Sequence, residues 1–325
     1  MLYIVLPETQ PSRRLSFYLA REEYVARCLK ADDYFFIWQV EPSVIFGRNQ
    51  LIENEVNQDF CRKHHIQMFR RKSGGGCVYA DRSNLMFSYI TGEQQVGFTF
   101  HRYITMVVST LQRLGIDASA TGRNDVMIGD RKVSGNAFYR LPGRSIVHGT
   151  MLYDTDMLNM VGAITPSDAK LLSKGVASVR QRVALLKDYT TLTIDEFKDF
   201  VRKHLCDEEY VLTADDVRQI EDLEQEYLSP DFIYGKNPRY TVVRRKRIEG
   251  VGELEARMEV KNGIIKSVNL MGDYFLVGDL DRGLLDKLRD VPLTHEALRR
   301  VLPDRIDDII MNLITEDFIL LLTES

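Results

Sequence analysis

Cysteine is scarce in this chain of 325 residues, and none of the four cysteines lies close in sequence to another. Cys28, Cys61, Cys77 and Cys206 form no CxxC pair and no Cys/His ligand cluster. Neither a disulfide framework nor a structural zinc site is therefore indicated. A reducing cytosol is the simplest setting for such thiols.

Long hydrophobic runs are also missing. The apolar run near the end of the sequence, 318–322, is far too short to span a bilayer. The opening residues MLYIVLPETQ lack the basic region and long apolar segment of a signal peptide. We therefore expect a cytoplasmic protein with no membrane partner. Repeats with a period of about 20 to 50 residues are absent too, which excludes solenoids and propellers.

Positive charge is not in excess. The 43 basic and 47 acidic residues give a formal net charge of −4, which argues against binding nucleic acid through bulk charge. A local anion site remains compatible with this balance. With 44% hydrophobic and 28% charged residues, the composition is that of a folded globular protein, and the length favours two domains.

Helical and strand patterns alternate in the first half of the chain. Apolar spacing predicts helices at 13–30, 53–65 and 98–114, and strands at 2–6, 34–40, 43–47, 78–79 and 86–90. The next three strands, at 125–128, 131–139 and 145–152, are predicted to form an antiparallel meander with its first turn at Gly129-Asp130.

The second half changes character near residues 235–238. Before this point we expect helices at 193–204 and 214–227, the first begun by Thr193 as N-cap with Glu196 three residues later. After it we expect strands at 240–248, 253–260 and 264–270, with a hairpin turn at Asn262-Gly263, and helical segments at 280–288 and 306–314. The sequence thus predicts an α+β protein with a large first domain and a small second one.

The densest cluster of unusual residues is RRKSGGGCVY, residues 70–79. Consecutive glycines let backbone N–H groups turn toward one anion, and the arginines add charge-assisted donors for carboxylate or phosphate. The segment predicts a phosphate or nucleotide site, with a tight glycine hinge beside a solvated basic run as the alternative. It matches neither the GxxxxGK[ST] nor the GxGxxG pattern.

Two further features lie on the predicted meander. Lys132 shares a strand face with Ser134 and could point inward at a ligand that Gly135 allows to come close. The alternative is a lysine beside a turn, exposed to water. The second feature is His148-Gly149-Thr150 at the end of a strand; a single histidine there is more often structural than catalytic.

Together these motifs resemble the lipoate–protein ligase family, part of the biotin/lipoate ligase and transferase superfamily. The resemblance runs through most of the chain and is carried, in order, by 19–23, Trp38-Gln39, Pro42, 46–50, 70–79, Asp81, Asn84, 122–125, 130–137, 148–150, 178–183 and 234–238. It implies a large mixed-sheet catalytic domain at 1–236 and a small α+β accessory domain at 237–325.

The resemblance also implies a reaction. Members of the family use ATP and Mg²⁺ to adenylate lipoate, then pass the lipoyl group to a lysine of an apo lipoyl domain. The acceptors belong to 2-oxoacid dehydrogenase complexes and to the H protein of glycine cleavage. Because a carboxylate must attack an α-phosphate, the site has to neutralise two anions. By resemblance Lys132 is the catalytic residue, bridging the acyl carbonyl and the α-phosphate.

The other site residues follow from the same resemblance. ATP and adenylate would contact Arg71, Lys132 and the backbone of Gly76, Cys77, Val78 and Tyr79. The loop would be shaped by Arg70, Ser73, Gly74 and Gly75. The lipoyl group would be bordered by Glu22, Trp38, Lys132, His148 and Gly149. Asn124 and Asp125 would contact adenine or Mg²⁺, for which Asp125 offers a hard oxygen ligand; both roles stay open.

The chain departs from the family pattern at Ala80, at Cys77 and at Arg82-Ser83, where leucine and glycine are more frequent. Ala80 stands where histidine is frequent, which removes a side chain able to close over the ligand. Cys77 replaces a common alanine and is either a nucleophile or a small core residue. The basic run 244–247 either steers acidic lipoyl domains or forms a solvated hairpin face.

Three other functions fit the sequence less well. An octanoyl or lipoyl transferase needs no ATP but forms a thioester on cysteine, and Cys77 is the candidate for that thiol. A biotin ligase would carry a GRGRxxR-type loop, which is absent. A non-catalytic lipoate or adenylate binding protein would fit Ala80, but the presence of Lys132 and of the glycine segment argues against it. In the ligase reading the small domain is expected to swing about a hinge at 235–238.

Overall fold

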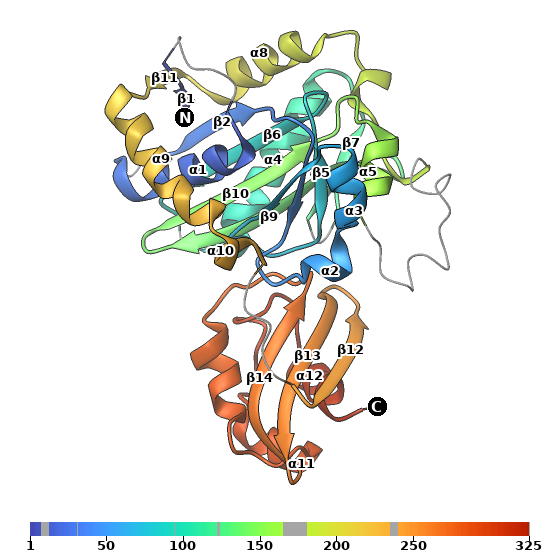
Figure 1. Ribbon diagram of the computed structural model, residues 1–325. Coiled ribbons are helices and arrows are strands. Elements are labelled where there is room, and N and C mark those ends of the chain that lie inside the picture. Colours follow the sequence, from blue (N-terminus) through green and yellow to red (C-terminus); the bar gives the residue numbers. More distant parts are fainter. Residues whose placement is uncertain are drawn as a thin grey trace.

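The computed structural model describes residues 1–7, 13–30, 32–93, 95–121, 124–164, 181–234 and 240–324. The proposed hinge at 235–238 and the motif residues 122–123 and 178–180 lie outside these ranges. Figure 1 shows a large domain built around a broad sheet, with a smaller domain packed against one end of it.

An eight-stranded sheet forms the centre of the large domain. Its strands, in spatial order, are β11 (Glu208–Val211), β1 (Leu2–Val5), β2 (Tyr34–Trp38), β6 (Leu85–Thr91), β10 (Arg144–Met151), β9 (Arg131–Leu141), β8 (Asp125–Ile128) and β7 (Ala118–Ala120). Strand β1 runs parallel to both of its neighbours, and the remaining pairs are antiparallel. The sheet is therefore mixed, and the predicted meander forms its β8–β9–β10 part.

Helices cover both faces of this sheet (Figure 1). Helix α1 (Leu15–Cys28) and helix α9 (Ala214–Leu228) pack on one face, and α4 (Val96–Arg113) and α8 (Ile194–Leu205) pack on the other. The predicted capping box is confirmed, since Thr193 and Glu196 exchange side-chain to backbone hydrogen bonds at the start of α8. Helix α9 is followed by α10 (Pro230–Tyr234), and η1 (Leu186–Asp188) precedes α8.

A second, three-stranded sheet carries the glycine segment. It consists of β4 (Gln67–Arg70), β3 (Ser43–Phe46) and β5 (Val78–Ala80), with α5 (Met157–Ala163) nearby. The single helix predicted at 53–65 is wrong, because α2 (Ile52–Glu55) and α3 (Gln58–Lys63) are separate. Val56 between them is extended and bridges Ile164, and the Asn57 side chain caps α3 by accepting a hydrogen bond from Phe60 N.

The small domain pairs β12 (Val242–Ile248), β13 (Gly252–Lys261) and β14 (Ile264–Gly272) in an antiparallel sheet. The predicted turn is confirmed, with Asn262 and Gly263 both at positive φ. The helical segment predicted at 280–288 is confirmed, and it consists of the π-helix η2 (Asp281–Leu285) followed by the 3₁₀ helix η3 (Asp286–Leu288).

The helix predicted at 306–314 is wrong. Ile306, Ile310 and Leu313 are buried, which explains their helical spacing, but the backbone forms turns and Asn312 adopts a positive φ. The α-helices of this region are α11 (His295–Val301) and α12 (Thr315–Thr323). In the part of the chain that the structure describes, no helix combines the length and apolarity needed to cross a membrane.

Candidate active site

A cavity of about 100 Å³ opens where the two sheets of the large domain meet. Its walls gather most of the residues that the sequence singled out: Trp38, Arg71, Gly75, Gly76, Cys77, Val78, Asn124, Lys132, His148 and Gly149. The other lining residues are Leu19, Ile45, Met86, Gly135, Asn136, Ala137 and Thr150. Residues far apart in sequence thus form one site.

Part of the cavity wall is apolar and is organised around Trp38. The Trp38 ring stacks on Tyr18 with 5.0 Å between ring centroids. Its indole Nε1 donates a hydrogen bond to Ser88 Oγ at 2.8 Å, so the ring orientation is fixed by packing and by one polar contact. Leu19, Ile45 and Met86 complete a surface suited to a hydrocarbon chain.

Lys132 contributes one of the two cations that line the cavity, and Arg71 contributes the other. The Lys132 Nζ lies 2.8 Å from Asp125 Oδ1, but the two groups are not aligned for a hydrogen bond, so the contact is ionic. The Lys132 side chain crosses Gly135, where a Cβ would lie 2.7 Å from Nζ. Glycine at position 135 is therefore what lets the ammonium occupy this place.

The two asparagines beside Lys132 hold β9 against the segment before β8. Asn124 Nδ2 donates to the Asn136 carbonyl at 2.9 Å, and Asn136 Nδ2 donates to the Asn124 carbonyl at 3.0 Å. This reciprocal pair fixes the backbone next to Asp125. Asn124 faces the cavity, while Asp125 contacts it through Lys132.

Arg71 holds the glycine segment together from within. Its guanidinium donates to the carbonyls of Ile45 at 3.0 Å, Gly74 at 2.6 Å and Gly76 at 2.8 Å, and to Ser73 Oγ at 2.8 Å. Burial lowers the pKa of Arg71 to about 10, which still leaves it charged at neutral pH. A buried cation thus lies beneath the loop and borders the cavity.

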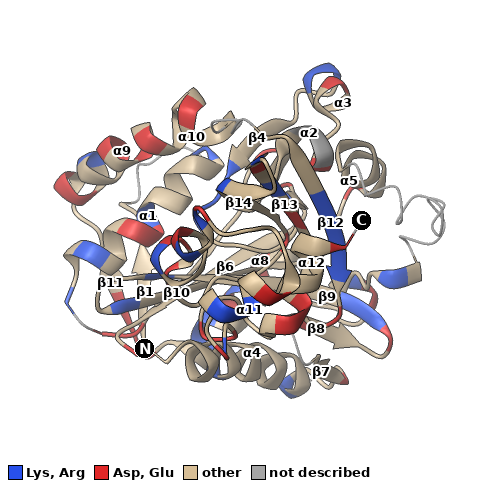
Figure 2. Ribbon diagram, turned by 90° about the horizontal axis from the view of Figure 1, so that it is seen from below, with Lys and Arg blue, Asp and Glu red and all other residues tan. Residues whose placement is uncertain are grey.

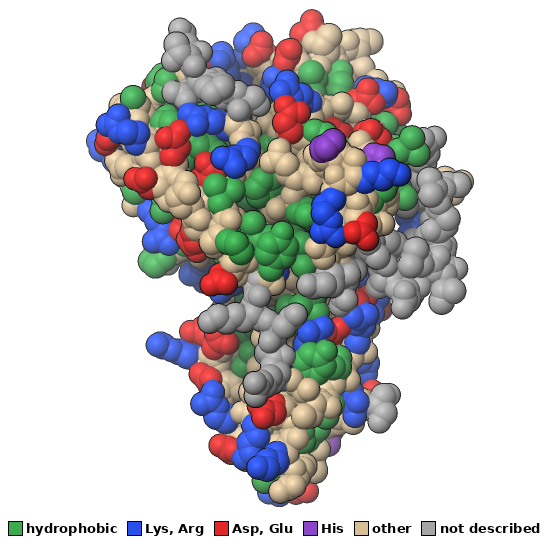
Figure 3. Space-filling model, viewed as in Figure 1, with side chains coloured by type: hydrophobic (Ala, Val, Ile, Leu, Met, Phe, Trp, Pro, Cys, Tyr) green, Lys and Arg blue, Asp and Glu red, His purple; other side chains and the backbone are tan. Residues whose placement is uncertain are grey.

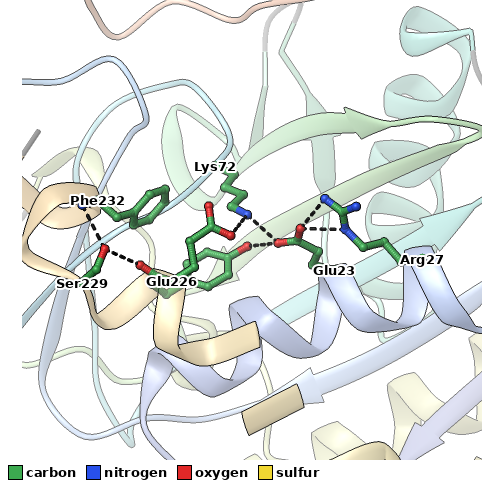
Figure 4. Close-up of polar contacts among 7 residues, drawn as sticks. Glu23, Arg27, Lys72, Glu226, Ser229 and Phe232 are labelled. Carbon is green, nitrogen blue, oxygen red and sulfur yellow. Dashed lines mark hydrogen bonds and ion pairs between the residues drawn. The ribbon is translucent and has the colours of Figure 1, made fainter. Parts of the chain in front are cut away.

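The other two cations of the run also have protein partners. Arg70 donates to the carbonyls of Gly47, Arg48 and Gln50 and, through Nε, to that of Ile233 in α10. Lys72 pairs with Glu23 and Glu226, as drawn in Figure 4. The alternative prediction, in which the basic run is solvated, is therefore wrong, because these side chains are bound to carbonyls and carboxylates.

A buried polar chain connects the glycine segment to α1. Ser73 Oγ lies 2.7 Å from His148 Nε2, and His148 Nδ1 lies 2.8 Å from Glu22 Oε2. Ser88 Oγ donates to Glu22 Oε1 at 2.5 Å. Glu22, Ser73 and Ser88 are fully buried and His148 is 4% exposed. His148 and Trp38 face the cavity, whereas Glu22 lies behind them, where it contacts His148 directly and Trp38 only through Ser88.

The small domain reaches the glycine segment. Gly75 N donates to the Tyr274 carbonyl at 3.1 Å, and a Cβ at position 74 would lie 2.3 Å from the same oxygen. The Phe275 ring stacks on Phe138 at 5.7 Å and also contacts Phe100. One amide of the expected anion cradle is thus occupied by the chain's own carbonyl.

The turn that carries Asp81 and Asn84 is structural. Asp81 accepts hydrogen bonds from the Ser83 and Asp156 amides, and Asn84 Oδ1 accepts one from the Tyr153 amide. Ala80 is fully buried opposite Ser43 in the small sheet. The Tyr79 side chain also points into the core, so this residue could reach the cavity only with its backbone.

Three of the four cysteines are unsuited to nucleophilic chemistry. Burial raises the pKa of Cys28, and raises it to about 11 for Cys61 and to about 12 for Cys206. Cys77 differs, because it lines the cavity. Among the described residues, no group of three or more His, Cys, Asp and Glu side chains gathers as a metal site.

Surface charge is mixed in sign. Figure 2 shows acidic and basic residues interspersed over the elements, with a concentration of basic ones on β12, and Figure 3 shows the same mixture on one face. On β12, Arg245 pairs with Glu255 and Lys246 with Glu324. Part of the basic run at 244–247 is thus neutralised within the small domain.

Sequence reasoning missed Glu23, Ser88 and Phe275. The signal for Glu23 was present, because Glu22 and Glu23 are adjacent acids in α1 and follow a third charged residue, Arg21; all three are buried. Buried carboxylates need partners, so they mark polar networks. Ser88 and Phe275 carry no such signal in the sequence.

Comparison with family models and curated relatives gives a consistent result. Residues 15–206 match the lipoyl protein ligase A/B catalytic domain, and residues 237–322 match the bacterial lipoate protein ligase C-terminus. Lipoate–protein ligase 1 of Staphylococcus aureus is 39% identical, covering 86% of this chain and 89% of that one. Lipoate-protein ligase LplJ of Bacillus subtilis is 32% identical, covering 93% and 94%.

Solved structures agree on the fold. LipL1 of P. falciparum, in a complex with lipoate, has a TM-score of 0.77 at 20% identity and covers 99% of this chain and 98% of that one. A lipoate-protein ligase A bound with ATP has a TM-score of 0.60 at 25% identity, covering 72% and 97%. The mixed-sheet fold expected from the sequence is confirmed.

Proposed function

This chain belongs to the lipoate–protein ligase family, and we propose that it activates lipoate with ATP and transfers the lipoyl group to a lysine of an apo lipoyl domain. The observation that carries this proposal is the cavity itself, where one wall is apolar and the other combines Lys132, Arg71 and the glycine segment. Such a cavity fits an acyl chain ending in a carboxylate beside a phosphate.

The first half-reaction joins two anions, and the charges of the site suit that task. Lys132 and Arg71 are cations that both border the cavity. We assign Lys132 to the acyl carboxylate and α-phosphate, where a fixed positive charge stabilises the developing transition state. Arg71 and the amides of Gly76, Cys77 and Val78 are assigned to the ATP phosphates. Arg70, Ser73, Gly74 and Gly75 give the loop its shape.

In the second half-reaction, a lysine of the acceptor attacks the acyl carbonyl and AMP leaves. Negative charge then builds on the carbonyl oxygen, and Lys132 is assigned to stabilise it there as well. The flexible stem of Lys132 and its unaligned contact with Asp125 allow the ammonium to follow the reacting atoms.

Mg²⁺ fits this site only in part. Asp125 is a carboxylate at the site, but it already pairs with Lys132. Mg²⁺ would be held by Asp125 together with the ATP phosphates, where it would supply charge neutralisation. Asn124 is assigned to the nucleotide, because its side chain borders the cavity beside Lys132.

Lipoate is assigned to the apolar part of the cavity, against Trp38, His148 and Gly149. Glu22 would act on this pocket through its hydrogen bonds to His148 and Ser88. The catalytic unit comprises residues 1–236, and residues 237–325 form the accessory domain. We propose the lipoyl domains of 2-oxoacid dehydrogenases and the glycine cleavage H protein as acceptors. A cytoplasmic location is proposed because all four cysteines are free thiols.

Cys77 favours one alternative function, acyl transfer without ATP. Its position on the cavity wall would allow a thioester to form on its sulfur. The deciding experiment measures pyrophosphate release and lipoylation of an apo lipoyl domain by the wild-type protein and by Cys77→Ala. Pyrophosphate release that requires lipoate, and that persists in Cys77→Ala, supports the ligase. Transfer from a carrier-protein thioester without ATP, abolished by Cys77→Ala, would establish the transferase instead.

A further inference from the structure

The Lys72 ammonium bridges two helices of the large domain. Lys72 directly precedes Ser73 and the glycine triplet, and its Nζ lies 2.8 Å from Glu23 Oε2 on α1 and 2.7 Å from Glu226 Oε2 on α9 (Figure 4). The side chain is 17% exposed and also lies over the Tyr227 ring, 4.9 Å from its centroid. Because its ammonium is held by these two helices, Lys72 does not line the cavity formed by the described residues.

Glu23 is a firm anchor for this lysine. It is 1% exposed, and its two oxygens accept hydrogen bonds from Lys72, from Tyr227 Oη at 2.9 Å and from Arg27 Nε at 2.8 Å. A buried carboxylate without such partners would be strongly unfavourable. The hydrogen bonds of Glu23 to Tyr227 and Arg27 therefore fix the position of its carboxylate, which in turn fixes the Lys72 side chain. Lys72 in return neutralises part of the buried charge of Glu23.

The next residues of the loop cannot hold themselves in place. Gly74, Gly75 and Gly76 have no side chains, and glycine loses more backbone freedom on ordering than any other residue. Their geometry depends on the bond from the Gly75 amide to the Tyr274 carbonyl and on contacts made by the residues just before them, among which Arg71 binds the carbonyls of Gly74 and Gly76. Ser73 is bound through His148 to Glu22, and Lys72 is bound directly to Glu23. Two adjacent carboxylates of α1 thus hold two adjacent loop residues.

We propose that Lys72 is a positioning residue that sets the shape of the glycine segment for ATP phosphate by fastening it to α1 and α9. This inference rests on the proposed function, since it takes the segment to be the ATP site. Lys72 itself touches no substrate. Its effect passes through Ser73 and the backbone of the glycine triplet.

The test uses the full chain with variants of graded severity. Lys72→Met removes both ion pairs, and Lys72→Met combined with Glu23→Gln also removes the buried charge left behind. Glu226→Gln removes only the outer, half-exposed arm. Lys72→Arg keeps the charge. The matched control is Lys266→Met, which breaks an exposed pair 2.6 Å long with Asp290 in the small domain.

Two quantities are measured on each variant. Pyrophosphate release gives KM for ATP and for lipoate, and amide hydrogen exchange reports the order of residues 71–79. We expect Lys72→Met and the double variant to raise KM for ATP roughly tenfold, with KM for lipoate changed by less than about twofold. Exchange should accelerate at 71–79, Lys72→Arg should restore most of both effects, and Lys266→Met should match the wild type.

The proposal is overturned if the double variant leaves KM for ATP and exchange at 71–79 unchanged. It is equally overturned if both KM values rise together while exchange accelerates throughout the large domain, since that is general loosening. If the wild type releases no pyrophosphate with lipoate, the proposed function fails, and exchange at 71–79 still decides the positioning role on its own.

Discussion

The Lys132 ammonium lies 2.8 Å from the Asp125 carboxylate and crosses Gly135, the residue that leaves room for it. The pair is ionic and unaligned, and both side chains are partly exposed. A pair of this kind is weak compared with a buried, aligned one. Lys132 is therefore held close to the place that the proposed reaction assigns to it, and it can still turn toward an anion that enters the cavity.

Substituting Gly135 by alanine should separate the position of Lys132 from the stability of the fold. The added Cβ would lie 2.7 Å from Nζ, and the flexible end of the lysine can move away at little cost. We expect Gly135→Ala to unfold at nearly the wild-type temperature while kcat for adenylation falls. Lys132→Ala sets the scale, with a loss of about 100-fold or more. Normal kcat in Gly135→Ala would contradict the assigned place of the ammonium.

Removing the Phe275 ring should strengthen ATP binding. The Gly75 amide donates to the Tyr274 carbonyl, so the glycine segment can adjust its shape to a bound phosphate only after residues 273–275 move away. Phe275→Ala loses the stacking on Phe138 and Phe100 and favours that displaced state. Equilibrium ATP binding should become tighter by about tenfold, for a loss of about 1.4 kcal/mol in docking. Weaker binding would mean that the ring supports the nucleotide site.

Arg21 should be replaceable with a gain in stability. Its side chain is buried against the rings of Tyr18 and Phe36, and its Nε and one terminal nitrogen have no hydrogen-bond partner among the residues that the structure describes. Burial lowers its pKa to about 10. Because an unsatisfied buried charge is costly, Arg21→Met should raise the unfolding temperature by a few degrees, for about 1 to 2 kcal/mol.

The matched control for Arg21 is Arg144. Arg144 is buried to a similar degree, but its guanidinium donates to the carbonyls of Ala26, Lys30 and Asp32. Arg144→Met should therefore lower the unfolding temperature. A decrease in both variants, measured by calorimetry, would contradict the account of Arg21.

Glu23 gives the Lys72 network a pH signature. Burial raises the pKa of Glu23, but the hydrogen bond and charge of Lys72, with bonds from Tyr227 and Arg27, outweigh burial and leave it below 4.5. The ionised Glu23 therefore stabilises the fold above about pH 4.5. This stabilisation is lost as the pH falls through the pKa that Glu23 has in the folded state.

In Lys72→Met the burial effect should dominate, and the pKa of Glu23 should rise. Arg27, Tyr227, Tyr139 and Glu226 still face this part of the network. The stability lost relative to the wild type should be largest near pH 7, and it should shrink as the pH falls from the raised pKa of Glu23 in the variant toward its depressed pKa in the wild type. Urea unfolding measured from pH 3 to pH 8 checks this, and a difference independent of pH would show that Glu23 is not involved.

The sequence predicted those elements that are determined by residues close together in the chain. The meander, the capping box at Thr193 and the hairpin at Asn262-Gly263 depend on neighbouring residues, and all three are confirmed. The short strands β4, β7 and β11 were not predicted, because their formation depends on pairing with distant partners. The helical spacing at 306–314 misled for a similar reason, since turns can also present buried residues at that interval.

The sequence predicted part of the cavity wall but not its contacts. The resemblance to the family identified ten of the lining residues, and the structure brings these together, whereas Glu22, Tyr79 and Asp125 lie behind the wall. Nothing in the sequence indicated that Arg70 and Arg71 would bind backbone carbonyls, or that Tyr274 would occupy the Gly75 amide. Such contacts join segments that only the tertiary fold places side by side.

The central claim is that this chain couples ATP cleavage to lipoylation. The most direct measurement incubates the purified protein with ATP, Mg²⁺, lipoate and an apo lipoyl domain, omitting one component at a time, and follows pyrophosphate and acceptor mass. Pyrophosphate should appear only when ATP and lipoate are both present, and the acceptor should gain one lipoyl group only in the complete mixture. Acceptor modification that proceeds equally well without ATP would contradict the account.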